Sequence, residues 1–175
     1  MSFSADGTVR RSMSRLKDDH VVLEMPRMDP ALRQEILSIL ESATDMTIAT
    51  IRQDGYPQAT MVSYVNDGLT IYFGCAAESQ KAKNIASNSK VSLTVKLPYS
   101  SWDEIRGLSM GGRAEPVTDP KELNRAGRLM FQKFPQILQY ALAGKKGVFL
   151  FRITPEIVSV LDYRKGFAHT DLVEV

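Results

Sequence analysis

The sequence is poor in the residues that build metal centres and disulfides. It holds one cysteine, Cys75, and two histidines, His20 and His169, among 175 residues. A single cysteine excludes an intrachain disulfide and a cysteine-built metal site. Two histidines far apart in the sequence leave a zinc centre with almost no ligands. We therefore expect no metal site in this protein.

Long hydrophobic runs and an excess of one charge are also missing. No run of about 18 apolar residues is present, which excludes a helix that spans a bilayer. With 22 basic and 20 acidic residues the net charge is +2, so no basic stripe for nucleic acid is expected. The first residues lean basic, at Arg10 and Arg11, but lack the apolar core of a signal peptide. These features predict a cytoplasmic protein without membrane or nucleic-acid partners.

The composition is that of one globular domain. Hydrophobic residues make up 43% of the chain and charged residues 24%. Residues 1–28 mix Ser, Gly, Arg and Asp without periodicity, which predicts a loose arm before a domain over 29–175. That domain opens with a helix, because Asp29 can cap it and Pro30 suits its first position. Its apolar face is Leu32, Ile36, Ile39, Leu40 and Ala43.

After this helix the apolar residues recur with a period of two, which is typical of strands. Turn signals at Asp54-Gly55 and at 66–68 separate the first three runs and predict an antiparallel meander. Gly111 and Gly112 lie inside a later run and indicate a bulge or a close approach of another backbone or ligand. The predicted strands cover 46–52, 57–65, 69–75, 90–97, 106–117, 147–153 and 156–163.

A further helix is predicted from Asp119-Pro120, with Glu122 in a capping-box position. It carries Leu123, Met130 and Phe134, and Pro135 breaks or kinks it before a helical pattern that resumes over 136–144. Six or seven antiparallel strands with inserted helices predict a mainly β, α+β fold. A closed or nearly closed β-barrel is favoured, because closure removes exposed strand edges.

The stretch Glu78–Ile85, "ESQKAKNI", predicts a helix behind the third strand, with two lysines near its start. Cations are disfavoured there by the helix dipole. On an ideal helix Lys81 shares a face with Ile85, whereas Lys83 faces solvent. Lys81, the free amides of the helix start and the hydroxyl of Ser79 could together form an anion cradle. Alternatively, Lys81 only extends across an apolar surface to water.

The motifs "SQKAKNI", "SNSKVSLTV" and "GGRAEPV" resemble the pyridoxamine 5′-phosphate oxidase-like flavoproteins, the FMN-binding split-barrel family. The resemblance runs from about residue 46 to 117, with a fainter echo over 147–169. It implies a split β-barrel homodimer that binds FMN at the subunit interface. The FMN phosphate would lie on Ser79 and Lys81, and the FMN ring would lie against the second strand and the end of the third. The implied cofactor-binding residues are Thr60, Met61, Val62, Ser63, Phe73, Gly74, Ser79, Gln80, Lys81 and Trp102.

The sequence departs from the authentic oxidase where that enzyme grips its phosphorylated vitamin. An Arg and a Lys of its second strand are replaced by Thr60 and Val65, and Gln80 replaces an arginine of its helix motif. Near its C-terminus the oxidase has an Arg-x-His-Asp-Arg arrangement. This chain has Phe167–Asp171, "FAHTD", in its place, and only the histidine is kept. Because an anionic substrate needs those cations, we expect the flavin site without the vitamin B6 site.

The predicted function is that of an FMN-dependent oxidoreductase acting on a small organic molecule. The cofactor supplies the difficult chemistry, so no catalytic acid or base has to be visible. His169 is a candidate proton donor or substrate contact in a partner's pocket, or a surface histidine. Cys75 is a redox-active thiol near the flavin, or a small buried hydrophobe.

Two alternatives to this function stay open. One is a non-catalytic module that stores or senses flavin or haem, with His169 or His20 as an axial haem ligand. The other is a deazaflavin-dependent reductase of the same fold.

Overall fold

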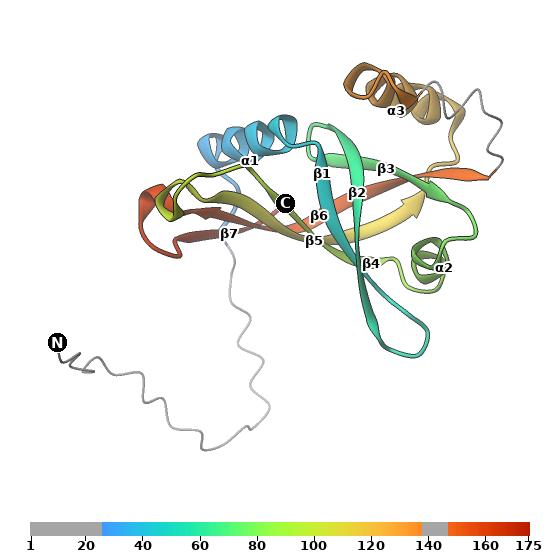
Figure 1. Cartoon of the computed structure of the whole chain (residues 1–175), viewed down its shortest axis with the longest axis horizontal. Coiled ribbons are helices and arrows are strands. Elements are labelled where there is room, and N and C mark those ends of the chain that lie inside the picture. Colours follow the sequence, from blue (N-terminus) through green and yellow to red (C-terminus); the bar gives the residue numbers. More distant parts are fainter. Residues whose placement is uncertain (1–25, 138–146) are drawn as a thin grey trace.

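Antiparallel strands dominate the computed structural model, which describes residues 26–137 and 147–175 (Figure 1). Most of the predicted arm and most of the predicted helical stretch over 136–144 therefore lie outside the described residues. The elements are α1 (Pro30–Ser42), β1 (Asp45–Ile51), β2 (Pro57–Asp67), β3 (Thr70–Ala76), α2 (Gln80–Ser87), β4 (Lys90–Lys96), η1 (Trp102–Glu104), β5 (Arg106–Pro116), α3 (Pro120–Lys133), β6 (Val148–Asp162), η2 (Tyr163–Lys165) and β7 (Thr170–Glu174).

Six of the strands close into a barrel. Their order is β3-β2-β1-β4-β5-β6, and a further pairing of β3 with β6 closes the ring. The remaining strand, β7, pairs with the far half of β6 outside the ring. The predicted α+β split barrel is confirmed. Within the two described ranges, the helices are too short and too polar to cross a membrane.

One long strand replaces two predicted ones. Residues 147–153 and 156–163 were expected as separate strands, but Val148–Asp162 is continuous. On the edge of β6 that faces away from β5, pairing with β3 ends at Ile153 and pairing with β7 begins at Ile157. Pro155 is tolerated because it lies between these two pairings. No neighbour on that edge needs the missing amide of the proline. The last strand, β7, was missed because it is short and has one buried residue, Val173.

The predicted irregularity at Gly111 and Gly112 is a β-bulge opposite this proline. Gly111 pairs with Ile157 and Gly112 with Pro155, so the register shifts between them. A Cβ on Gly112 would lie 2.4 Å from the carbonyl oxygen of Thr154 and 2.9 Å from the Cα of Pro155. Only a residue without a side chain allows β5 and β6 to approach this closely.

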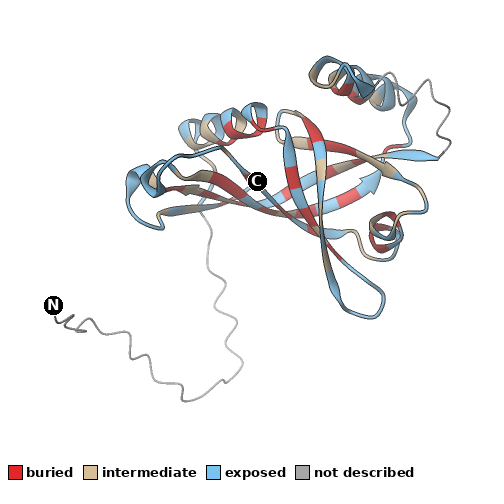
Figure 2. Cartoon of the chain, in the orientation of Figure 1, coloured by how far each residue is buried: buried red, intermediate tan, exposed pale blue. Residues whose placement is uncertain are grey.

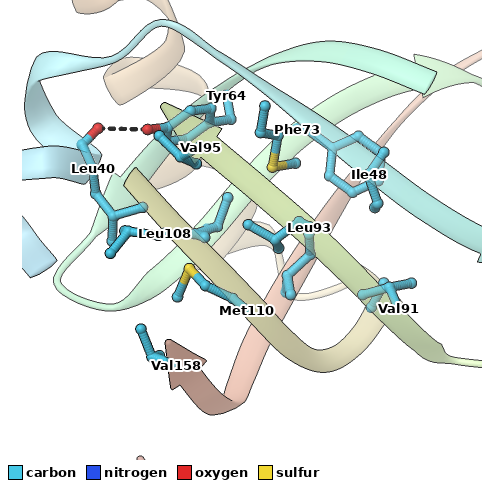
Figure 3. Close-up of a cluster of buried hydrophobic side chains, with 14 of the residues drawn as sticks. Leu40, Ile48, Tyr64, Phe73, Val91, Leu93, Val95, Leu108, Met110 and Val158 are labelled. Atoms are coloured by element: carbon cyan, nitrogen blue, oxygen red, sulfur yellow. Dashed lines mark hydrogen bonds between the residues drawn. The ribbon is translucent and has the colours of Figure 1, made fainter. Parts of the chain in front are cut away.

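Buried side chains alternate along the strands and fill the barrel interior (Figure 2). Burying each large apolar side chain contributes about 1.5–3 kcal/mol. The predicted face of α1 covers one opening of the barrel, with Ile36, Ile39 and Leu40 fully buried. Tyr64 is also fully buried, and its hydroxyl donates to the Leu40 carbonyl at 2.8 Å (Figure 3). This burial raises the pKa of Tyr64.

The helix α3 lies against the outside of the barrel, over β2, β3 and β6. Asp119 caps it by accepting from the Glu122 amide at 2.8 Å. The Glu122 carboxylate does not complete a capping box. It accepts instead from the Tyr72 hydroxyl at 3.1 Å and from Arg152 at 3.0 Å. At the other end, the Lys133 ammonium donates to the Ala43 carbonyl at 2.6 Å. Both ends of α3 are thus attached to the barrel or to α1.

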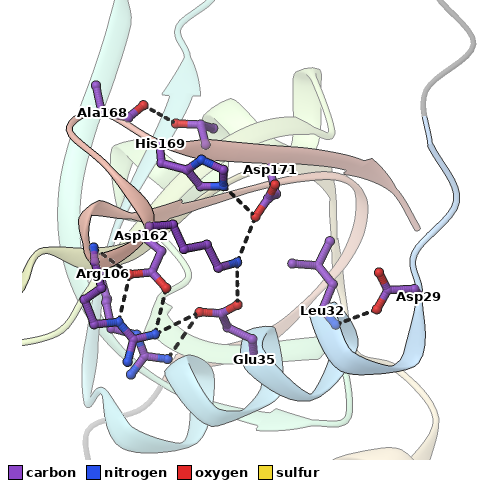
Figure 4. Close-up of polar contacts among 11 residues, drawn as sticks. Asp29, Leu32, Glu35, Arg106, Asp162, Ala168, His169 and Asp171 are labelled. Carbon is purple, nitrogen blue, oxygen red and sulfur yellow. Dashed lines mark hydrogen bonds and ion pairs between the residues drawn. The ribbon is translucent and has the colours of Figure 1, made fainter.

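An ionic cluster joins α1 to the end of β6 (Figure 4). Glu35 accepts from Lys165 at 3.2 Å and lies 3.4–3.5 Å from Arg164 and Arg106. Asp162 is fully buried and accepts from the backbone amide, Nε and Nη2 of Arg164 at 3.1, 2.8 and 2.7 Å. These hydrogen bonds from Arg164 hold the pKa of Asp162 well below its usual range.

The bulge can be tested by comparing its two glycines. Gly112→Ala should lower the free energy of unfolding by about 3 kcal/mol, because the new methyl group meets rigid backbone. Gly111→Ala is the matched control, because a Cβ there has no heavy atom within 4 Å. It should be neutral or stabilising by up to about 1 kcal/mol. Urea unfolding measures both, and equal stability of the two variants would contradict the bulge geometry.

The buried carboxylate predicts a specific response to acid. Because the folded pKa of Asp162 is depressed, its contribution is present above the ordinary value of 3.8 and is lost as pH falls through the folded pKa. Asp162→Asn should cost about 1–3 kcal/mol in urea unfolding at pH 7. Its deficit relative to wild type should shrink in strong acid. Glu174→Gln, at an exposed site, should change stability by less than about 0.5 kcal/mol. A constant deficit of Asp162→Asn at every pH would argue against this role.

Candidate functional site

An open pocket of about 610 Å³ lies on the outer face of β2, β3 and β6, between the start of α2 and the end of α3. This volume is in the usual range for small-molecule and cofactor sites. The described residues that line it are Met61, Val62, Ser63, Gly74, Cys75, Ala76, Ser79, Lys81, Met130, Phe134, Gln136, Ile137, Val148 and Leu150. Six of the ten predicted cofactor-binding residues are among them.

The start of α2 forms the polar end of the pocket. Ser79 is the N-cap, and its hydroxyl accepts from the Ala82 amide at 3.3 Å and donates to the Cys75 sulfur at 3.4 Å. Lys81 is half-buried and lines the pocket, and no carboxylate within residues 26–137 and 147–175 forms an ion pair with it. Lys83 is exposed and pairs with Glu78 at 3.4 Å. The two lysines therefore differ as the sequence predicts.

A buried amide holds α2 on the barrel. The Asn84 side chain is 1% exposed and donates to the Thr50 hydroxyl at 2.9 Å and to the Gln58 side chain at 3.1 Å. Gln80 in turn donates from Nε2 to the side-chain oxygen Oδ1 of Asn84 at 2.8 Å. Gln80 thus orients the helix and is not among the pocket-lining residues. Sequence reasoning missed Asn84, although the spacing of Gln80 and Asn84 is typical of side chains that meet on one helix face.

Two other predicted residues on the same strands lie off the pocket. Phe73 is fully buried inside the barrel and stacks on Phe151, with ring centroids 5.4 Å apart. A ligand on the outer face can reach only the backbone of Phe73. The Thr60 hydroxyl is buried and has no hydrogen-bond partner among the residues that the structure describes.

The segments that carry Trp102 and His169, η1 and the turn between η2 and β7, lie at the opposite end of the barrel from α2 (Figure 1). Trp102 is 69% exposed and stacks on Phe167, with ring centroids 6.2 Å apart. The His169 Nε2 lies 3.1 Å from the Asp171 carboxylate. Hydrogen bonds from Lys165 and His169 lower the pKa of Asp171. One chain therefore does not bring these two predicted residues to the pocket.

The apolar wall of the pocket was not predicted as part of a site. It consists of Met130 and Phe134 at the end of α3, Ile137, and Val148 and Leu150 of β6. In the sequence, Met130 and Phe134 have the spacing of a buried helix face. Nothing local indicates that this face ends beside an opening, because the end of α3 meets β6 only in the folded chain.

The residues predicted as an anion cradle lie beside a floor made of strand residues. The cradle combines the Ser79 hydroxyl, the Lys81 ammonium and the first amides of α2, which have no acceptor within the helix. The floor includes Gly74, where a Cβ would lie at an ordinary 3.5 Å from Val148 Cγ1. Packing within this chain therefore does not require glycine at position 74. A phosphate with an attached planar ring fits these features.

Known proteins resemble this chain in sequence and in fold. The family model for pyridoxamine 5′-phosphate oxidase matches residues 32–162. A pyridoxine/pyridoxamine 5′-phosphate oxidase from Shewanella sediminis (strain HAW-EB3) is 31% identical over 142 residues, which cover 74% of this chain and 63% of that protein. The chain thus spans less than two thirds of the length of this relative.

Two solved structures share the architecture. A conserved hypothetical protein from Mycobacterium tuberculosis is 30% identical with a TM-score of 0.66, over 79% of this chain and 87% of that one. A heme binding protein from Mycobacterium smegmatis has a TM-score of 0.72 at 19% identity, over 84% of this chain and 59% of that one, and shows likeness of fold alone. Because the family model covers most of the sequence, the chain belongs to the pyridoxamine 5′-phosphate oxidase family.

Proposed function

We propose that this chain binds FMN in the pocket between α2 and α3 and acts as an FMN-dependent oxidoreductase on a small organic molecule. The observation that carries the proposal is the half-buried Lys81 beside the capping hydroxyl of Ser79, at the edge of a flat strand floor. A phosphate held there would also offset the unfavourable position of a cation at a helix start.

The residues present fit the phosphate group. Lys81 supplies a charge-assisted hydrogen bond, and the first amides of α2 supply neutral donors. The Ser79 hydroxyl, which donates to the Cys75 sulfur at 3.4 Å, would add a donor by rotating toward the phosphate. The network from Gln80 through Asn84 to Thr50 fixes the direction in which these donors point. Preorganised donors reduce the entropy cost of binding.

The chain has a limited part in the chemistry. Bound FMN supplies hydride transfer, so the protein has to orient the ring and exclude water. The strand floor at Ser63 and Gly74 can orient a ring. No proton transfer by a side chain is required for these tasks.

Haem is the second candidate, because a structural neighbour from Mycobacterium smegmatis is a heme binding protein. Haem needs an axial ligand. The described lining residues include no histidine, and His169 lies at the far end, bonded to Asp171. His20 lies outside the described residues. Within one chain these positions favour FMN, and only a partner's His169 in a dimer could supply an axial ligand to haem. The absorption spectrum of the purified protein separates flavin from haem, and the mass of the bound cofactor separates FMN from a deazaflavin.

A homodimer would complete the site. Met61 and Phe149 are 75% and 53% exposed near the pocket, and Trp102 and Phe167 are 69% and 78% exposed at the far end. A second copy that covers both regions would bury this apolar surface and bring a partner's Trp102 and His169 toward the flavin. The site in one chain is open on one side, and dimerisation would close it.

The phosphorylated form of vitamin B6 does not fit as a substrate. Val65 is 3% exposed beneath α3 and Gln80 is engaged with Asn84, so neither can grip a substrate phosphate. Phe167 is apolar where the authentic oxidase resembled by this sequence has an arginine. We propose that the substrate is a different small molecule.

The phosphate cradle is tested by two lysine variants. Lys81→Ala should weaken FMN binding by about 10- to 150-fold, because one charge-assisted contact of about 1.5–3 kcal/mol is lost. Lys83→Ala is the control, because Lys83 is exposed and pairs with Glu78. Its affinity should stay within about twofold of wild type. Quenching of FMN fluorescence measures both.

Thermal melting without FMN gives an independent readout. Lys81→Ala should unfold at the same temperature as wild type or slightly higher, because removal of a cation from a helix start relieves about 0.3–1 kcal/mol. Equal FMN affinities of Lys81→Ala and wild type, or a larger loss in Lys83→Ala, would refute this placement of the flavin.

Dimerisation predicts a solution mass of about twice the 19.5 kDa of the chain, measured by light scattering. Trp102→Ala should then weaken FMN binding about tenfold or less, because a partner's ring contributes stacking of about 0.5–1.5 kcal/mol. The far-end control is Tyr99→Ala, which removes an aromatic side chain that is 46% exposed. A monomer that binds FMN tightly would show that the site needs no second copy.

A further inference from the structure

The pocket has a polar end and an apolar end. The polar end is Ser79 and Lys81 at the start of α2. The apolar end is the α3–β6 wall, formed by Met130, Phe134, Ile137, Val148 and Leu150. Figure 1 shows α2 and α3 well apart, on either side of the strands that carry the floor. A molecule held by its phosphate at α2 would therefore leave the α3–β6 wall for another occupant.

Among the described residues, no charged side chain lines the apolar end. Lys81 is the one described lining residue with a charge, and it lies at the polar end. Arg152 follows Leu150 on the same face of β6, but its guanidinium bonds to Glu122 at 3.0 Å and to Glu115 at 2.9 Å. Within residues 26–137 and 147–175, an anionic occupant of the wall would therefore have no free cation beside it.

Hydrogen-bond donors are also scarce along the floor. The Ser63 hydroxyl donates to the Asp45 carboxylate at 2.6 Å. The Ser79 hydroxyl donates to the Cys75 sulfur at 3.4 Å. Gln136 is exposed at the rim and is the remaining amide among the described lining residues. A molecule bound at the wall would therefore gain free energy by burying apolar surface, and it would find few hydrogen-bond partners for polar atoms among the described residues.

We infer that the substrate of this site is a neutral, mainly apolar molecule that contains a ring and binds against the α3–β6 wall. This inference rests on the proposed function in one respect, because it assigns Lys81 to the flavin phosphate. An anion placed on the wall would lose its hydration without gaining a partner, and that cost is large. A neutral ring would gain about 25 cal/mol for each Å² of apolar surface buried.

The test uses two probes that share one ring and differ in charge. 2-Naphthalenemethanol is neutral, and 2-naphthoate carries a carboxylate. Equilibrium dialysis against the FMN-loaded protein should show the alcohol binding at least tenfold more tightly. Equal affinities, tighter binding of 2-naphthoate, or no binding of the alcohol would each overturn the inference.

A variant with an added cation tests the location. Ile137 lines the wall and is 41% exposed, so Ile137→Lys can be expected to fold. It should raise the affinity for 2-naphthoate about tenfold and leave FMN binding within about twofold. The matched control is Ile157→Lys, which adds the same charge at a site that is equally exposed, at 41%, and does not line the pocket. An equal gain in both variants would show that net charge, not the wall, governs binding.

A further arm separates this inference from the proposed function. If FMN does not bind the wild-type protein, the proposed function fails, and the probes are dialysed against Lys81→Ala without FMN. Among the described lining residues, that variant has no charged side chain. A tenfold preference for the alcohol there would support an apolar seat without a flavin. Loss of that preference would overturn the inference as well.

Discussion

Backbone pairing between β3 and β6 is the interaction on which the rest of the structure depends. It closes the barrel, with Ile71 opposite Ile153 and Ala76 opposite Val148. The same pairs form the floor of the pocket, because Gly74 lies opposite Leu150. β6 can pair with the strands of the ring and with the outer strand β7 because it is 15 residues long. Pro155 lies in the gap between its pairing with β3 and its pairing with β7. The pairing that closes the ring therefore also forms the floor of the site.

The orientation of α2 follows from a rule about buried polar groups. A buried amide without partners costs about 1–3 kcal/mol, so Asn84 must be satisfied. Its bonds to Thr50 and Gln58 meet that need in the observed orientation of the helix. That orientation turns Ser79 and Lys81 toward the pocket and leaves Lys83 with Glu78 in solvent. A structural requirement thus fixes the geometry of the candidate phosphate cradle.

Members of one fold can hold different cofactors, because function depends on the site and not on the barrel. This chain resembles in fold a heme binding protein and in sequence a vitamin B6 phosphate oxidase. We propose that its own described residues separate it from both. The described pocket has no histidine to ligate iron, and a single lysine where a second anion would need further cations. The apolar end of α3 then becomes the feature that distinguishes this site.

The sequence by itself determined most of the elements and the different surroundings of the two lysines of α2. Hydrophobic alternation located the strands, Asp29 and Asp119 located two helix starts, and helical spacing separated Lys81 from Lys83. These features are local, so neighbouring residues suffice to predict them. Continuity of β6 across Pro155 was decided by tertiary structure, since it depends on which strands pair with its edge. Distant segments also decided the burial of Phe73, the role of Gln80 and the apolar wall of α3 and β6. Such contacts join residues far apart in the sequence, and no local pattern records which of them will meet.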